Sequence, residues 1–176
     1  MNKIKISRIS RDVYSQKGFD EHGCIGCQCK DMCCREGADV DKEAYDLILK
    51  HKDRIERISN IKFEDFFEHT WSGDTDFLGG NSIRSKVGTS GYCVFRIQDN
   101  KGCVLFKLVM EDGVSRRIIP SICRLFPVTW DNETLAYYER KHIPSTCNCL
   151  ELSNTTERSI FETQQEAIED ILDIRS

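Results

Sequence analysis

The chain has 176 residues, which is enough for one domain, or for one domain with an appended helix. Its 25 Lys and Arg residues against 29 Asp and Glu residues give a net charge of −4, whereas nucleic-acid binders are normally basic, so we expect no general nucleic-acid binding. The nine Phe, five Tyr and two Trp spread along the chain argue against intrinsic disorder.

Helical signals dominate the first half of the chain. Residues 1–21 are polar and are expected to be extended or partly ordered. Gly37 is expected to end a short helical turn over residues 29–34, because glycine readily adopts the left-handed cap conformation. An amphipathic helix is predicted over about residues 41–58, with Asp41 as its N-cap. A second apolar face at helical spacing follows, made of Phe63, Phe66, Phe67 and Trp71.

The second half predicts strands and further helices. Two β-hairpins are expected where turn-forming residues separate short β-prone segments. The paired segments are 92–98 with 102–106, and 126–130 with 134–139. Helices are predicted at 105–111, ended by Gly113, and at about 155–174, where an amphipathic helix closes the chain. The sequence thus predicts one small α+β domain over 1–176, cysteine-rich and stapled by metal, with antiparallel hairpins, amphipathic helices and a core at about 20–150.

Whether cysteines bind metal or form disulfides depends on the cellular compartment of the protein. The basic N-terminus is followed by no apolar stretch of the kind that a secretory signal contains, and no run of about 18 apolar residues predicts a membrane span. We therefore expect a cytoplasmic protein with no membrane partner. In a reducing cytoplasm, clustered cysteines more often hold metal than form disulfides. The alternative is a secreted disulfide scaffold whose signal peptide has been removed.

Ten cysteines are gathered in clusters along the chain. They are Cys24, Cys27, Cys29, Cys33, Cys34, Cys93, Cys103, Cys123, Cys147 and Cys149. Zinc ions and iron–sulfur clusters each take about four thiolates, usually from two or more chain segments. All ten are therefore candidate metal ligands, and the cofactor expected is zinc or an iron–sulfur cluster.

The adjacent residues Cys33 and Cys34 bear on the number of metal centres. On a helix their side chains diverge by about 100°, and on a strand they face opposite sides, so one tetrahedral ion rarely takes both. The adjacency indicates two metal centres or one cluster of several metal atoms. Six basic residues close to the cysteines could offset the negative charge of such a site: Lys30, Arg35, Lys101, Arg124, Arg140 and Lys141. Arg124 is expected either to donate to a cluster sulfur or to be a surface charge.

The cysteine pattern resembles the YkgJ-like family of zinc- or iron-chelating cysteine-cluster proteins. The first block has the family's Cys-x4-Cys-x3-Cys-Cys spacing, from Cys24 to Cys34, and is followed by Gly37. The second half holds Cys93, then Gly102-Cys103, then the more specific block Pro120-Ser-Ile-Cys123-Arg-Leu-Phe-Pro127. The match covers roughly residues 20–130.

The resemblance implies a metal- or cluster-binding domain with Cys24, Cys29, Cys33, Cys34, Cys93, Cys103 and Cys123 as ligands. Cys27 is extra to the family pattern and is the least necessary ligand, although Cys24 and Cys27 are themselves well spaced for metal. Cys147 and Cys149 join the set on their spacing alone. The stretch from Cys103 to Cys123 is longer than in the shortest family members. Relatives of the family include a flagellin lysine methylase with a similar cysteine cluster.

Four function classes stay open at this point. The leading one is a metal-binding domain whose metal helps to close the glycine-rich stretch 73–125. The alternative is an iron–sulfur-dependent enzyme, either redox or protein-modifying, for example by lysine methyl transfer; the chain lacks a GxGxxG dinucleotide or adenosyl-methionine motif. The others are a thiol oxidoreductase acting through Cys24 and Cys27, and an interaction adaptor. The sequence identifies no protein partner.

Overall fold

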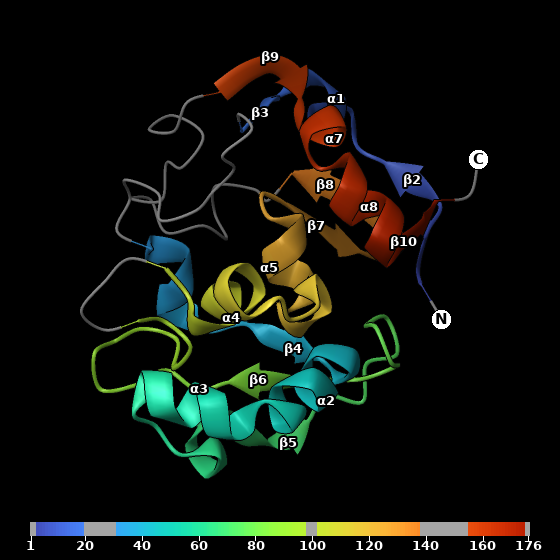
Figure 1. Ribbon diagram of the computed structural model, residues 1–176. Coiled ribbons are helices and arrows are strands. Elements are labelled where there is room, and N and C mark those ends of the chain that lie inside the picture. The colour runs from blue at the N-terminus through green and yellow to red at the C-terminus, as the bar shows by residue number, and fades with distance from the viewer. Residues whose placement is uncertain (1–2, 20–30, 98–101, 138–154, 175–176) are drawn as a thin grey trace. The chain divides into compact units, whose positions relative to one another are not determined.

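The computed structural model describes residues 3–19, 31–97, 102–137 and 155–174 and contains both helices and strands, which confirms the α+β class (Figure 1). The chain divides into two compact units. We call Cys33–Cys123 the central unit, and Met1–Met32 with Arg124–Ser176 the terminal unit. The organisation as one domain stays a prediction. In the described ranges, no helix has the length and apolar character needed to cross a membrane.

The central unit is built on a three-stranded antiparallel sheet of order β4-β6-β5. Its elements, including two that cross the unit boundary, are η1 (Met32–Glu36), β4 (Asp39–Asp41), α2 (Lys42–Lys50), α3 (Lys52–Ser59), η2 (Phe63–Asp65), β5 (Phe67–Trp71), β6 (Ser82–Ser85), α4 (Val104–Asp112), η3 (Arg116–Ile118) and α5 (Ser121–Leu125). Figure 1 shows α2 and α3 beside this sheet. The unit has a hydrophobic core of its own, to which sheet and helices both contribute.

The predicted helix at 41–58 begins as expected but is interrupted. Asp41 is the N-cap of α2, and its carboxylate accepts a hydrogen bond from the Ala44 amide at 2.9 Å. The helix ends at His51, whose φ of −106° and ψ of 13° leave the helical region, and α3 starts at the next residue. The apolar period runs through this break because Ile48 and Ile55, both fully buried, stand seven residues apart. The break at His51 therefore cannot be detected from the spacing of apolar residues.

The helical reading of the aromatic stretch is wrong, although its residues do form core. Phe63 lies in the short η2, and β5 runs from Phe67 to Trp71 and pairs with β6. Aromatic residues fit a half-buried strand as well as a helix face, and β6 supplies the hydrogen-bonding partner that decides between them. Phe66 and Phe67 are buried, and their rings contact Phe95 edge to face or tilted.

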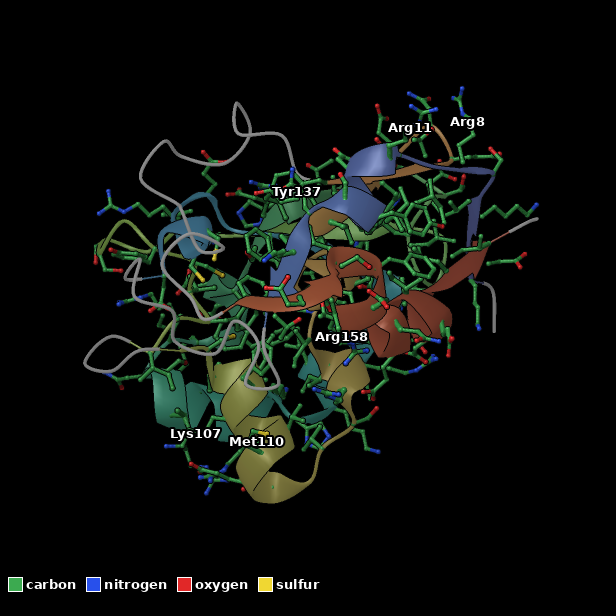
Figure 2. The ribbon with its side chains drawn as sticks, turned by 90° about the horizontal axis from the view of Figure 1, so that it is seen from above. Arg8, Arg11, Lys107, Met110, Tyr137 and Arg158 are labelled. Carbon is green, nitrogen blue, oxygen red and sulfur yellow. The ribbon has the colours of Figure 1, made fainter. Side chains whose placement is uncertain are left out.

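The predicted hairpin over 92–106 is also wrong, whereas the helix after it is confirmed. Cys103 is the N-cap residue of α4, so residues 102–106 form no strand. A reversal of the chain remains, since Arg96 and Cys103 form an isolated bridge. The helix α4 ends at Gly113, whose φ of 65° is the left-handed conformation expected there. Figure 2 shows Lys107 and Met110 on α4, where Met110 is 72% exposed.

The terminal unit joins both ends of the chain through small sheets. Its elements are β1 (Ile4–Ile6), β2 (Arg8–Ile9), α1 (Arg11–Ser15), β3 (Lys17–Phe19), β7 (Val128–Asp131), β8 (Thr134–Tyr137), β9 (Thr155–Ser159), α7 (Ile160–Thr163), α8 (Gln165–Ile171) and β10 (Leu172–Ile174). The sheets have the orders β1-β10, β2-β8-β7 and β3-β9, with β1-β10 and β2-β8 parallel. The N-terminal segment is thus ordered mainly by strands far along the chain.

Of the two predictions in this unit, one is confirmed and one is corrected. β7 and β8 form the expected antiparallel hairpin, and its turn residues Asn132 and Glu133 have φ values of 47° and 57°. The closing helix over 155–174 is shorter than predicted, because strands precede and follow it and Gln164 divides α7 from α8. Its start is a capping box of Ser159 and Glu162. The hydrogen bonds of β9 to β3 hold the residues before Ser159 extended.

Candidate metal centre

Five of the ten predicted ligands fall on described residues. Cys33 and Cys123 are exposed, and Cys34, Cys93 and Cys103 are half-buried. The other five, Cys24, Cys27, Cys29, Cys147 and Cys149, lie outside the described residues. The described cysteines come from four places in the central unit: η1, the loop after β6, the residue before α4, and α5.

Cys34 and Cys93 are joined through the backbone. The amide of Cys93 donates to the carbonyl of Cys34 at 2.6 Å, and Cys93 also bridges Val87 in the loop after β6. These contacts hold two cysteines that are far apart in the sequence against each other. The thiol of Cys93 lies 3.3 Å from the hydroxyl of Ser85, the last residue of β6.

Gly37 allows η1 to approach β6. Its φ is +72°, and a Cβ at this position would stand 2.6 Å from the carbonyl oxygen of Ser85. A side chain there would therefore be strained by the backbone and would clash with the neighbouring strand. The sequence correctly marked Gly37 as the end of the turn, but the close approach to Ser85 could not be read from it.

Cys103 precedes the first residue of a helix, and Cys123 lies in the middle of another. Cys103 precedes α4, and the amide of Val104 donates to the Phe95 carbonyl at 2.7 Å, which ties the start of α4 to the chain that follows Cys93. Cys123 lies in α5, whose first amide, that of Ser121, donates to the Asp41 carboxylate at 2.8 Å. The same carboxylate caps α2. Asp41 therefore fixes the position of the Cys123 helix relative to the sheet.

Four cysteines are close enough to act on one another electrostatically. Burial, followed by the neighbouring Cys93 and Cys34, raises the pKa of the Cys103 thiol. Burial and then Cys34, Cys103 and Cys93 hold the pKa of Cys123 well above its usual range. The Cys123 side chain itself is exposed, so water solvates its thiolate in part.

The pKa of the Cys93 thiol is raised as well, although two neighbouring residues lower it in part. Burial raises the pKa of its thiol, and the charge of Cys34 adds to this, while the Ser85 hydrogen bond and the Arg84 guanidinium lower it. Arg84 is held beside the site by Asp39, at 2.9 Å, and by the Glu36 carbonyl, at 2.6 Å. The residues Cys34, Cys93, Cys103 and Cys123, which we call the thiol cluster, thus share one electrostatic environment.

The donor chemistry of the thiol cluster suits zinc or iron. Four thiols from separate segments are the usual composition of structural zinc sites and of iron–sulfur sites. Their arrangement is looser than coordination requires, because among the described residues no three His, Cys, Asp or Glu side chains are grouped so as to hold a metal ion. Binding at this cluster would therefore have to draw the thiols together.

The adjacent residues Cys33 and Cys34 differ in their exposure to solvent. Cys34 is half-buried and acts on the three distant thiols, whereas Cys33 is exposed. That two adjacent cysteines do not share one tetrahedral centre stays a prediction. Arg124 pairs with Asp170 within the terminal unit and its side chain is 10% exposed, so it is not a surface charge. Ser85, Arg84 and Asp41 are neighbours of the cluster that the cysteine spacing could not reveal.

Comparison with known proteins identifies no relative: no family model, no curated protein and no solved structure matches the chain. The resemblance to cysteine-cluster proteins stays a prediction carried by the motifs themselves.

Proposed function

We propose that the chain is a metal-binding protein, in which cysteine thiolates of the central unit chelate zinc or an iron–sulfur cluster. The observation that supports this is the thiol cluster: the pKa of Cys93, Cys103 and Cys123, from separate chain segments, is raised first by burial and then by neighbouring thiols that include Cys34. Such a group is unfavourable as bare thiolates, since like charges repel. A bound cation reverses this balance because it stabilises the thiolate form and releases the protons.

The ligand set of this centre is Cys34, Cys93, Cys103 and Cys123. The described residues between β6 and α4, 86–97 and 102–103, supply two of the four and form no helix or strand, so they are the part expected to close on metal binding. A structural metal contributes on the order of 10 kcal/mol to folding, which is ample to order such a loop. Cys24, Cys29, Cys33, Cys147 and Cys149 stay candidate ligands of the same or a second centre.

The test compares cysteine variants of the full chain, purified without oxygen. Cys34→Ser and Cys123→Ser should each lose the same metal, so the double variant should lose no more metal than either single variant. Residues that act on one centre are non-additive in this way, whereas ligands of two centres would give additive losses. Equal retention of metal in the wild type and the double variant would contradict the proposal.

Cys27→Ser is the matched control, because it removes one thiol that the family pattern does not need. It should keep most of the metal. If the metal content falls as far in Cys27→Ser as in Cys123→Ser, the ligand assignment is wrong and the local pair of Cys24 and Cys27 is the better explanation. The absorption spectrum of the same samples separates a colourless zinc site from a brown iron–sulfur cluster.

A further inference from the structure

Ser85 stands out among the neighbours of the thiol cluster. It is 1% exposed, and its hydroxyl lies 3.3 Å from the sulfur of Cys93. The same hydroxyl accepts a hydrogen bond from the amide of Ala38 at 2.8 Å. A hydroxyl has one proton to donate and can accept two hydrogen bonds, so the Ala38 contact leaves the Ser85 proton available for Cys93.

The backbone of Ser85 is fixed on both sides. Its amide donates to the carbonyl of Ala38 at 2.9 Å, next to the β4-β6 pairing, and Ser85 is paired with Phe67 of β5 on the other side. A donor at the end of a central strand, hydrogen-bonded to strands on both sides, keeps its position if the Cys93 side chain shifts. This rigidity is what a hydrogen bond to a metal ligand requires in order to orient that ligand.

We infer that Ser85 is a positioning residue of the metal centre, whose hydroxyl donates a hydrogen bond to the Cys93 thiolate. The inference rests on the proposed function. A metal-bound thiolate has no proton of its own, so the only hydrogen available between the two atoms is that of the Ser85 hydroxyl. The bond withdraws electron density from the sulfur and orients one of its lone pairs toward the metal.

The test uses Co²⁺ as a spectroscopic probe for the zinc-type site in the full chain, after removal of native metal under reducing conditions. Ser85→Ala should bind Co²⁺ about 10-fold more weakly than the wild type, at the low end of what loss of a partner to a metal ligand costs. Its sulfur-to-cobalt charge-transfer band should also move to lower energy, because the unbonded thiolate is the stronger electron donor. A purely structural role of Ser85 would not move this band.

Ser82→Ala is the matched control, since Ser82 is also 1% exposed and lies on the same strand. Its hydroxyl contacts that of Ser72 at 2.9 Å. This variant should keep the wild-type affinity and band position. If the two serine variants behave alike, the inference about Ser85 is overturned and the proposed function stands. If the wild type itself binds no Co²⁺, both fail.

A second measurement covers the case in which Ser85→Ala does not fold. In the wild type loaded with ¹¹³Cd²⁺, the Ser85 hydroxyl proton should show a scalar coupling to the metal through the Cys93 sulfur. A hydroxyl proton of Ser85 without this coupling, or one that exchanges with water too fast to be observed, would overturn the inference.

Discussion

Asp41 is the residue on which most of the central unit's geometry depends. One carboxylate oxygen accepts the Ala44 amide at the start of α2, and the other accepts the Ser121 amide at the start of α5. The first contact was predictable, because an Asp before an amphipathic segment is a common helix start. The second was not, since the partner is 80 residues away.

We predict that Asp41→Ala destabilises the protein by about 2–3 kcal/mol, because it removes a helix cap and leaves the buried Ser121 amide without its acceptor. Urea unfolding of the metal-loaded protein measures this loss. Asp46→Ala is the control on the same helix: its partner is Lys42, both side chains are well exposed, and the loss should stay below about 1 kcal/mol. Equal losses in the two variants would contradict the role assigned to Asp41.

The charge of Asp41 also predicts a pH dependence. Burial raises its pKa above the ordinary value of 3.8, although hydrogen bonds from Ser121 and Ala44 oppose the shift. An acid with a raised pKa in the folded state binds more protons when folded than when unfolded. Its contribution to stability therefore falls as the pH rises from 3.8 through the folded-state pKa.

Asp41→Asn removes this titration. The free energy of unfolding of Asp41→Asn relative to the wild type should therefore increase between about pH 4 and the raised pKa, and then level off. Urea unfolding of both proteins across this range tests it, and the comparison cancels the other carboxylates. A difference that decreases with pH would mean that the pKa of Asp41 is lowered by folding.

At the scale of elements, the contact of η1 with β6 decides where Cys34 lies. We predict that Gly37→Ala weakens metal binding and destabilises the protein by more than the backbone strain alone, because the new Cβ would meet the Ser85 carbonyl at 2.6 Å. Gly80→Ala is the control, since Gly80 has a nearly identical φ of +74° with nothing within 4 Å. It should cost about 1–2 kcal/mol of stability and leave metal affinity unchanged. Similar metal affinities in the two variants would count against this placement of η1.

Elements with local signals were predictable from the sequence. The α2 cap at Asp41, the end of α4 at Gly113 and the turn between β7 and β8 each depend on residues within one or two turns of chain. The secondary-structure predictions are wrong where pairing with a strand far away in the sequence determines the local structure. Phe67 and Trp71 have helical spacing but pair with β6, and the residues before Ser159 pair with β3.

The candidate site divides in the same way. The sequence included Cys34, Cys93, Cys103 and Cys123 among ten candidate ligands but did not single out these four. Cys33 and Cys34 differ in exposure, and their assignment to different metal centres stays a prediction. The residues beside this group could not be predicted from the sequence, because Arg84 and Ser85 lie in β6, which itself contains no cysteine. Their role depends on the pairing of β4 with β6.

At the scale of the whole molecule, the two units should respond differently to metal removal. We predict that chelation increases amide hydrogen exchange in the described residues between β6 and α4, which contain Cys93 and form no helix or strand. The β1-β10 pairing of the terminal unit contains no predicted ligand and should keep its protection. Hydrogen exchange with mass spectrometry, with and without chelator, measures both. Equal changes in the two units, or no change between β6 and α4, would contradict this localisation.

If this chain holds a metal through its cysteines, the protein purified without oxygen must contain that metal. We predict at least about one equivalent of zinc plus iron per chain, with Cys34, Cys93, Cys103 and Cys123 protected from alkylation until the metal is removed. A content below about 0.2 equivalents, with these four thiols reacting at once, would contradict the account.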